Sequence, residues 1–558
     1  MQQFRGFLFL VFFLAANAGA QTPLANAAIA SAHPLATAAG KAILQQGGNA
    51  FDAAVAVAAA LAVVEPYGSG LGGGGFFLLH RARDGKQVMI DSRERAPFKA
   101  TPNMYRNAAG QVLPQASLEG PLAAAIPGIP AGLAHLAQRY GRLSLAQSLA
   151  PAIRLAEQGF PADARYRALA QSHLTLLQRQ PEAAAQYLQN QAVPEPNALI
   201  VQANLGKTLR ALAQHGASGF YRGAVAKEMV AAVQAAGGIW QRADLARYRI
   251  VERQPIAFDY RGMHIVSAAT PSAGGLTLAE ALHILERYDL NALKPAQRMH
   301  LVVEALRRAY HDRARYMGDP DFVSMPLQRL MSPRYADERA ASIDLANATL
   351  SADLDKAPQV QQGNHTTHFS IVDRQGNRVA ATLSINTFFG SGFVAGKSGV
   401  LLNNEMDDFA VAEHGMNVYG LVNSGPNRIA PGKRPLSSMT PTFVEDARGT
   451  LILGAPGGSR IISMVLLGIL NYQSQTQVDL QALVSAPRYH HQYLPDQLEV
   501  EPDSFPGSVL DELQLIGHVV RVSKQKWGNM QAVWIDRASG EAFAASDPRG
   551  IGSGVAWH

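Results

Sequence analysis

The stretch SADLDKAPQVQQGNH (351–365) followed by TTHFSIVDRQGNRVAATLSI (366–385) decides the fold of this 558-residue chain. Its first part has almost no large apolar residues and predicts an exposed linker. Its second part holds two strand-like runs, 367–372 and 378–385, around a turn at 373–377. Antiparallel pairing about Gln375 places residue 366 or 367 opposite residue 384 or 385. We therefore expect Thr366 and Ser384 to be neighbours.

Strand and helix patterns flank this hairpin on both sides. The helical patterns lie at 35–46, from 52, over most of 130–350 and from about 461, and the strand patterns lie at 76–79, 400–402, 442–445 and 450–453. A glycine-rich segment, 68–75, precedes the first of these strands and predicts a tight loop. The order of elements predicts an α+β protein, and no internal repeat is visible.

Composition narrows the class of protein. Apolar residues make up 47% of the chain and charged residues 16%, below the roughly 25% of an average soluble protein. These values exclude a coiled coil and wholesale disorder. The formal charge is +6 without a run of five basic residues, so nothing predicts a nucleic-acid partner. The chain has no Cys, which excludes disulfides, thiolate chemistry and Cys-ligated zinc.

The first 20 residues predict a signal peptide. Arg5 supplies the positive charge, residues 7–16 are apolar, and Ala18-Gly19-Ala20 fits the small-residue rule for cleavage. A membrane anchor is the alternative, but this apolar run is shorter than the roughly 20 residues that a spanning helix needs. We expect a periplasmic or secreted protein that starts near Gln21 and has no membrane partner.

Several patterns are weaker than they look. The segment 390–398 resembles a phosphate-binding loop, but neither of its possible starting glycines leaves the required spacing. The run Gly72 to Gly75 lacks the lysine and hydroxyl that such a loop needs, so close backbone packing is favoured. His490 and His491 are adjacent on a strand and should face opposite sides, which speaks against a shared metal. A GxSxG motif is absent, which disfavours a conventional serine hydrolase.

A set of short motifs carries the functional signal. They are GNAFDA (48–53), DSRERAP (91–97), TTH (366–368), SIN (384–386), NNEMDD (403–408), PLSSM (435–439), GAPGGSR (454–460), APRYHH (486–491) and SDPR (546–549). Each is weak alone. In this order and at this spacing, over nearly the whole mature chain, they resemble the gamma-glutamyltransferase (glutathione hydrolase) family.

The resemblance implies a four-layer αββα sandwich of the N-terminal-nucleophile hydrolase type and an autocatalytic cut between His365 and Thr366. A threonine hydroxyl is a poor nucleophile near neutral pH, but the α-amine of an N-terminal threonine can act as its base. An internal threonine has no such amine. We therefore expect a signal peptide (1–20), a large subunit (21–365) and a small subunit (366–558) that remain together as a heterodimer.

The resemblance also assigns the site. Thr366 is the expected nucleophile, Ser384 its hydrogen-bond partner, and the backbone N–H groups of Gly457 and Gly458 the expected oxyanion donors. For the substrate it implies Arg93, Ser437 and Ser438 at the α-carboxylate, Asn386, Glu405 and Asp408 at the α-ammonium, and Tyr419 in a lid over the pocket. Ser384 stands where many relatives have threonine, and Glu405 where bacterial relatives often have Gln; the extra negative charge should suit an ammonium.

The expected reaction is acyl transfer from glutathione and other γ-glutamyl compounds to water, an amino acid or a peptide. It needs no metal and no cofactor. Two other interpretations stay open. One is an acylase of the same fold with a shifted acyl specificity, such as glutaryl groups, although Asp408 disfavours it; the other is an uncleaved, inactive binding protein.

Overall fold

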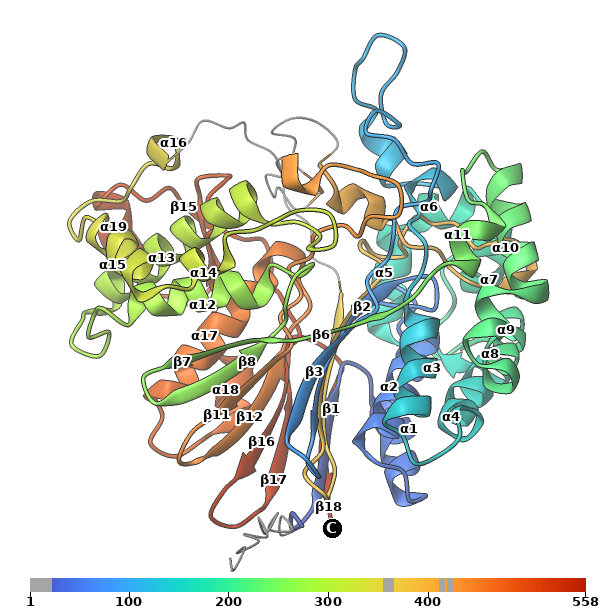
Figure 1. Cartoon of the computed structure of the whole chain (residues 1–558), viewed down its shortest axis with the longest axis horizontal. Helices are drawn as coiled ribbons and strands as arrows, with labels where there is room; N and C mark the ends of the chain where they lie inside the picture. The colour runs from blue at the N-terminus through green and yellow to red at the C-terminus, as the bar shows by residue number, and fades with distance from the viewer. Residues whose placement is uncertain (1–22, 355–365, 411–416, 419–424) are drawn as a thin grey trace, which may run out of the picture.

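Two β-sheets packed face to face lie between two layers of helices in the computed structural model (Figure 1). The structure describes residues 23–354, 366–410, 417–418 and 425–558. The signal peptide, His365 and Tyr419 therefore lie outside the described residues. The expected four-layer αββα sandwich is confirmed.

Each of the two main sheets combines strands from distant parts of the sequence. The seven-stranded sheet runs β18 (Ser553–Trp557), β1 (Ala27–Ser31), β9 (Thr367–Val372), β10 (Arg378–Ser384), β2 (Gly74–Arg81), β3 (Lys86–Asp91), β6 (Val251–Arg253). The six-stranded sheet runs β17 (Ala542–Ser546), β16 (Gln531–Asp536), β12 (Gly449–Gly454), β11 (Thr442–Glu445), β8 (Met263–Ser267), β7 (Ile256–Tyr260). Two small sheets hold β13 (Tyr489–His490), β14 (Leu498–Val500) and β15 (Val520–Val522), and β4 (Phe160–Pro161) and β5 (Leu199–Ile200).

Helices cover the outer face of each sheet (Figure 1). The layer beside the seven-stranded sheet contains α1 (Pro34–Gln45), α2 (Ala50–Val64), α3 (Ile129–Arg139), α4 (Leu145–Gln158), α5 (Ala164–Ser172), α6 (Leu174–Gln178), α7 (Pro181–Tyr187), α8 (Ala203–His215), α9 (Ala217–Tyr221), α10 (Gly223–Ala235) and α11 (Arg242–Ala246). The other layer contains α12 (Gly274–Leu285), α13 (Pro295–Tyr316), α14 (Leu327–Leu330), α15 (Pro333–Ala341), α16 (Ser351–Leu354), α17 (Ile461–Ser474), α18 (Leu480–Ser485) and α19 (Gly507–Leu515). Among the described residues, no helix is both long and apolar enough to cross a membrane.

The alternation of side chains along β2 shows how the layers are built. Phe76 and Leu78 join the apolar cluster that includes the second sheet, α12 and α17, whereas Phe77 and Leu79 join the cluster under α1 and α2. All four side chains have no exposed surface. A strand buried on both faces needs such a continuous apolar run, because successive side chains point to opposite faces.

The hairpin expected from the sequence is confirmed. β9 pairs with β10 in antiparallel register, with Thr367 opposite Leu383 and Arg378 opposite Val372. This register brings Thr366 beside Ser384 at the end of the pair. The expected helix near 461 is α17, and the strands expected at 442–445 and 450–453 are β11 and β12.

Some boundaries differ from expectation. The second helix begins at Ala50 rather than Asp52, because Asn49 and Asp52 form a capping box around its first turn. Residues 400–402 make only isolated bridges. The 130–350 region contains β6, β7 and β8 besides its helices. The expected linker starts as the short helix α16, where the buried Ser351 accepts a hydrogen bond from Arg307 and donates one to the Tyr493 carbonyl.

The run Gly72 to Gly75 packs as the backbone interpretation required. A Cβ atom on these four residues would lie only 1.9 to 2.3 Å from oxygen atoms of neighbouring segments. The loop therefore approaches the end of β10 and the segment at Leu401 too closely for any side chain. This contact holds β2 against the hairpin that carries Thr366.

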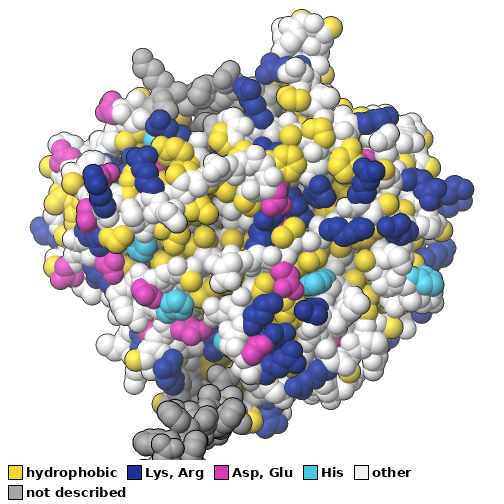
Figure 2. All heavy atoms as spheres, in the orientation of Figure 1, with side chains coloured by type: hydrophobic (Ala, Val, Ile, Leu, Met, Phe, Trp, Pro, Cys, Tyr) yellow, Lys and Arg dark blue, Asp and Glu magenta, His cyan; other side chains and the backbone are white. Residues whose placement is uncertain are grey.

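Charged side chains are distributed over the face shown in Figure 2 rather than gathered into one band. Lys and Arg occur across this face, and acidic side chains lie among them, mainly on the side of α12, α13 and α15. This face therefore shows no concentrated basic patch, in keeping with the small formal charge of +6.

Candidate active site

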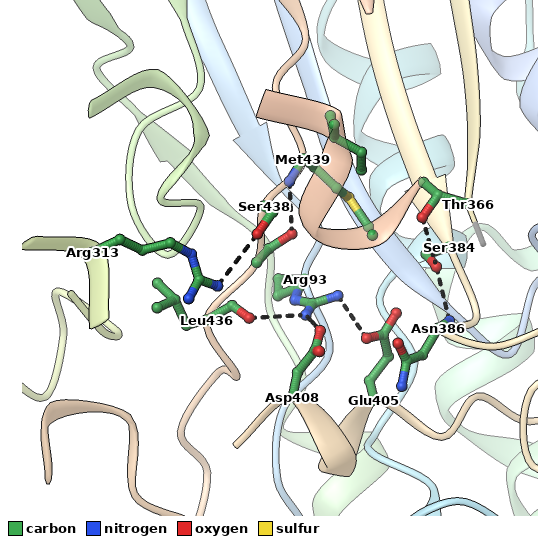
Figure 3. Close-up of a pocket in the computed structure, with 13 residues that line it drawn as sticks. Arg93, Arg313, Thr366, Ser384, Asn386, Glu405, Asp408, Leu436, Ser438 and Met439 are labelled. Carbon is green, nitrogen blue, oxygen red and sulfur yellow. Dashed lines mark hydrogen bonds and ion pairs between the residues drawn. The ribbon is translucent and has the colours of Figure 1, made fainter. Parts of the chain in front are cut away.

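A small cavity lies beside Thr366 (Figure 3). It is lined by Arg93, Arg313, Thr366, Ser384, Asn386, Glu405, Asp408, Leu436, Ser437, Ser438, Met439, Gly458 and Ile461. These residues come from both halves of the sequence. The cavity thus brings together most of the site residues expected from the sequence.

Thr366 is held at the edge of this cavity by the hairpin. Its Oγ1 donates to the Ser384 Oγ at 3.5 Å, and the same Ser384 oxygen accepts from the Asn386 N–H at 2.8 Å. Thr367 is anchored on the other side of the strand, because its hydroxyl donates to the Glu65 carboxylate at 2.6 Å. Thr366 is only 8% exposed. Its hydroxyl therefore has a fixed direction, toward the cavity and Ser384.

Two glycines carry N–H groups beside Thr366. Gly457 (φ 141°) and Gly458 (φ 57°) lie between β12 and the start of α17. A Cβ on Gly457 would meet the end of the Met464 side chain at 2.7 Å, and its φ disfavours any other residue. Within the described parts of the chain, neither N–H has a hydrogen-bond acceptor. Free N–H groups at a helix start can stabilise a negative oxygen.

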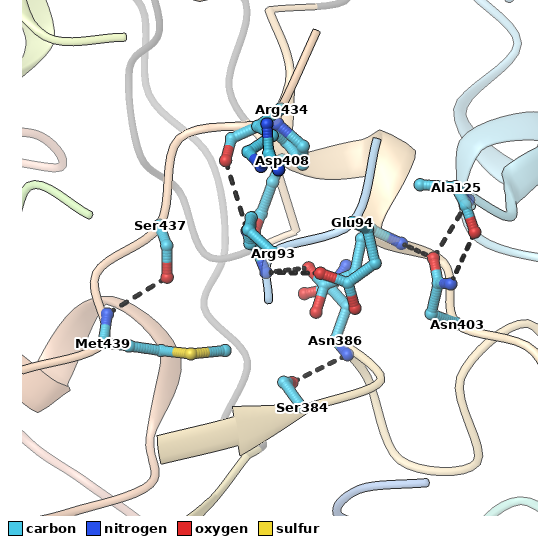
Figure 4. A network of polar contacts seen from close by, with 12 residues as sticks. Arg93, Glu94, Ala125, Ser384, Asn386, Asn403, Asp408, Arg434, Ser437 and Met439 are labelled. Carbon is cyan, nitrogen blue, oxygen red and sulfur yellow. Dashed lines mark hydrogen bonds and ion pairs between the residues drawn. The ribbon is translucent and has the colours of Figure 1, made fainter. Parts of the chain in front are cut away.

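Arg93 lies at the centre of a buried charge network (Figure 4). Its guanidinium pairs with Asp408 at 2.5 Å, Glu405 at 3.0 Å and Glu94 at 3.3 Å. It also donates to the carbonyls of Pro435 (3.2 Å) and Leu436 (3.4 Å). One cation thus faces three carboxylates in this network.

Burial controls the protonation of this network. Desolvation raises the pKa of Glu405 well above its usual range and that of Glu94 to about 8, although the adjacent Arg93 opposes both shifts. Burial therefore favours the protonated form of both carboxyls, whereas the ion pairs with Arg93 favour the ionised form.

Asp408 is oriented by two donors. Its Oδ2 accepts from Arg93, and its Oδ1 accepts from the Asn417 side-chain amide at 2.7 Å. The sequence analysis placed Arg93 and Asp408 at opposite charges of a substrate. In the structure they bind each other.

Ser437 and Ser438 lie in the loop that follows Arg434. The Ser437 hydroxyl oxygen accepts from the Met439 N–H at 3.1 Å, and the Ser438 hydroxyl oxygen accepts from Arg313 at 3.3 Å. A backbone bridge between Ser272 and Ser437 fixes the loop to the segment before α12. Both hydroxyls keep a proton that can be donated into the cavity.

Glu94 and Arg313 are the polar residues of this region that the sequence analysis missed. Glu94 stood within a motif, but only its buried contact with Arg93 reveals a role in the charge network. Arg313 lies on α13, outside every motif, and no local pattern marks it. Only the fold brings this helix to the cavity.

A second, larger cleft opens on the other side of Thr366. Its open volume is about 1130 Å³, and it is lined by Glu65, Tyr67, Arg165, Ala168, Leu169, Ser172, Thr366, Phe388, Pro456, Gly457, Gln525, Lys526, Trp527, Gly528, Asn529 and Arg549. Thr366 lines both spaces.

One buried cluster has metal-ligand residue types. His300, Glu304 and His518 offer atoms within 4.8 Å of one another. Glu304 is already paired with Arg307 and Arg308, and the His300 Nδ1 is hydrogen-bonded to the His518 Nε2 at 2.8 Å. The two arginines disfavour a divalent cation, so the cluster fits a polar core network better than a metal site.

Known proteins resemble this chain along almost all of its length. The family model of gamma-glutamyltranspeptidase matches residues 36–557. The glutathione hydrolase proenzyme of Escherichia coli (strain K12) is 41% identical over 528 residues, which cover 94% of this chain and 90% of that protein.

Two solved structures extend the comparison. The cephalosporin acylase from Bacillus halodurans has a TM-score of 0.83 at 28% identity and covers 100% of this chain and 99% of its own. The gamma-glutamyltranspeptidase from Helicobacter pylori has a TM-score of 0.58 at 38% identity and covers 62% of this chain and 98% of its own. With a family model that spans almost all of the described sequence, the chain belongs to the gamma-glutamyltranspeptidase family.

Proposed function

We propose that this protein transfers the γ-glutamyl group of glutathione and other γ-glutamyl amides to water, an amino acid or a peptide. The observation that carries the proposal is the position of Thr366. It lines the cavity together with Gly458 and the larger cleft together with Gly457, and the cavity offers both guanidinium and carboxylate groups. A γ-glutamyl group needs both charges, because it carries an α-carboxylate and an α-ammonium.

Activation requires a cut before Thr366. The Thr366 Oγ attacks the carbonyl carbon of His365, the peptide C–N bond breaks, and the nitrogen takes up the hydroxyl proton to become the α-amine. Water then hydrolyses the ester and leaves a carboxylate on His365. The products are a large subunit, 21–365, and a small subunit, 366–558, which form a heterodimer.

The catalytic cycle follows from the free α-amine. The amine accepts the hydroxyl proton of Thr366 while the oxygen attacks the γ-carbonyl carbon. The negative oxygen of the intermediate lies against the N–H groups of Gly457 and Gly458. The amine half takes a proton from the α-ammonium of Thr366 and leaves through the larger cleft. Water or an acceptor amine then enters from the same side and releases the acyl group.

When substrate binds, its two charges replace the ion pair between Arg93 and Asp408. The α-carboxylate takes a place on Arg93, assisted by the hydroxyls of Ser437 and Ser438, and the α-ammonium takes a place on Asp408 with Glu405 and Asn386. Each buried charge then keeps a partner of opposite sign, which limits the cost of desolvation. Tyr419 is proposed to close over this site as part of a lid. The scheme uses no metal and no cofactor.

A second candidate activity is that of an acylase with a shifted acyl specificity. It is favoured by the close structural likeness to the cephalosporin acylase. A glutaryl group keeps a carboxylate for Arg93 but lacks the α-ammonium, so it would leave Asp408 without a substrate partner. The γ-glutamyl reaction therefore fits the cavity better.

The deciding experiment is the intact mass of the purified protein under denaturing conditions, followed by rate measurements. Wild type should yield two fragments that start near Gln21 and at Thr366, and should release amine from glutathione faster than from the matching glutaryl amide. Thr366→Ala should remain one chain from Gln21 to the end and be inactive. Faster glutaryl turnover would favour the acylase, and an uncut wild-type chain would favour a binding protein. A start near Gln21 would also support export to the periplasm or the medium.

A further inference from the structure

Arg313 is a buried guanidinium that the substrate scheme above does not use. It lies near the end of α13, is 2% exposed, and lines the cavity that contains Thr366 (Figure 3). Its Nη2 donates to the Ser438 Oγ at 3.3 Å. Its Nε and Nη1 are buried and find no hydrogen-bond partner among the residues that the structure describes.

The other buried arginines of the same helix are paired. Arg307 contacts Glu304 and Asp496, and Arg308 contacts Glu304 at 2.5 Å. Arg313 has no carboxylate within ion-pair distance in the described structure. Burial lowers its pKa to about 10, with opposing effects from Tyr310 and Asp408, so the side chain stays charged at neutral pH. An unpaired buried charge is costly, which singles out Arg313 among these three residues.

The charge balance of the cavity indicates that Arg313 is available to an anionic group of the substrate. Arg93 is already compensated by Asp408, Glu405 and Glu94 before any substrate is present. Arg313 is the cavity's other guanidinium, and it is directed at the Ser438 hydroxyl. A hydroxyl that accepts a hydrogen bond from a cation directs its own proton outward and becomes a better donor to an anion.

We propose that Arg313 determines specificity for the α-carboxylate of the acyl donor, acting through the Ser438 hydroxyl and through its own uncompensated charge. The proposal rests on the proposed γ-glutamyl activity. It makes Arg313 a positioning residue with a defined target, since the α-ammonium side of the cavity contains Asp408, Glu405 and Asn386. Loss of Arg313 should therefore weaken recognition of one substrate charge and leave the other unaffected.

Three anilides with the same leaving group separate the two charges. γ-Glutamyl-4-nitroanilide carries both, glutaryl-4-nitroanilide carries only the carboxylate, and 4-aminobutanoyl-4-nitroanilide carries only the ammonium. For Arg313→Gln we expect kcat/KM to fall about tenfold to a hundredfold for the first two substrates, mainly through KM. For the third substrate we expect a change within about twofold, because it offers no anion to this side chain.

Controls make the outcome specific. Arg298→Gln removes a guanidinium from the start of the same helix, away from the cavity, and should leave all three rates unchanged. Arg313→Lys keeps the charge and should recover part of the lost kcat/KM; if Arg313→Gln fails to mature, Arg313→Lys enters the same three-substrate comparison. Rates are normalised to the amount of fragment that starts at Thr366.

An equal loss on all three substrates would show a structural role and overturn the proposal, as would unchanged KM values for the two carboxylates. A wild-type enzyme that is cut but fails to turn over γ-glutamyl-4-nitroanilide would instead refute the proposed function. The two failures are therefore distinguishable.

Discussion

At the scale of single residues, the three carboxylates around Arg93 are not equivalent. Glu405 is 1% exposed and its pKa is raised by burial, whereas Asp408 has two hydrogen-bond donors, one on each carboxylate oxygen. We therefore predict that Glu405 binds substrate as a protonated acid and that Asp408 is the main partner of the α-ammonium. Gln in place of Glu405 would then change little, because a protonated acid and an amide have similar shape and polarity.

This difference predicts opposite outcomes for two isosteric substitutions. Glu405→Gln should keep KM for a γ-glutamyl amide within about threefold of wild type, whereas Asp408→Asn should raise KM at least about tenfold, because it removes the partner of the α-ammonium. Steady-state kinetics of both variants at pH 7 are the measurement. A large KM effect of Glu405→Gln would mean that Glu405 is ionised in the complex.

Glu65 provides a test of buried charge that is independent of activity. Burial raises its pKa from 4.5 to about 6, although the Thr367 hydroxyl hydrogen-bonds to it. Between these values the folded chain keeps a proton that the unfolded chain has lost. The free energy of unfolding therefore falls as the pH rises through this window, by about 2 kcal/mol for one group.

Glu65→Gln should remove this dependence. Relative to wild type, the variant should gain about 2 kcal/mol in the free energy of unfolding between pH 4.5 and pH 7. Urea unfolding of the uncut Thr366→Ala chain, with and without Glu65→Gln, is the measurement. Glu541→Gln at an exposed position is the matched control and should show a flat difference. A flat difference for Glu65→Gln as well would show that Glu65 is ionised at no cost.

At the scale of elements, the hairpin was predictable because its information is local. The turn at 373–377 and the apolar runs on both sides set the register that places Thr366 beside Ser384. The helix α17 was recognisable for the same reason. β7 was missed, although Phe258 and Tyr260 alternate with exposed residues and a turn follows at Arg261 and Gly262.

The missed parts of the site depend on contacts between distant segments. Arg313 reaches the cavity because α13 packs with α12 beside the second sheet, and its partner Ser438 is 125 residues further along the chain. Likewise, Arg93 and Asp408 are separated by 315 positions. Composition and periodicity do not predict such long-range pairs. The motifs could therefore suggest the site residues but not the ion pairs between them.

The loop before β2 offers a test at this scale. A Cβ on Gly73 would lie 2.0 Å from the Ser384 carbonyl oxygen, so Gly73→Ala must displace the end of β10. We expect this variant to lose most of its cleavage before Thr366 and to be less stable by several kcal/mol, because backbone has to move. The fraction of cut chain, read by intact mass, checks the prediction.

Gly70→Ala is the matched control in the same loop. Its Cβ would lie 3.6 Å from the Ile385 side chain, an ordinary contact. This variant should be cut and folded like wild type. If both variants were cut normally, the position of Ser384 would not depend on the loop, and the link between the loop and Thr366 would be wrong.

At the scale of the whole molecule, both proposed fragments contribute strands to each of the two main sheets. In the seven-stranded sheet, β9 and β10 of the small fragment lie between β1 and β2 of the large one, and β1 lies between β9 and β18. In the six-stranded sheet, β11 of the small fragment pairs with β8 of the large one. The fragments therefore share backbone hydrogen bonds in both sheets as well as both apolar clusters.

This arrangement predicts that the cut protein behaves as one folding unit. Neither fragment can keep its sheet without the other, since separation would expose strand edges and the apolar faces of β2 and β9. We expect the native mass of the cut enzyme to equal the sum of its fragments even after extensive dilution, and both fragments to unfold in a single thermal transition. Separately expressed fragments should be insoluble or unfolded. Dissociation of the cut enzyme on dilution, or melting in two steps, would show that each fragment has a core of its own. The cut would then separate two domains instead of releasing the amine of Thr366 within one.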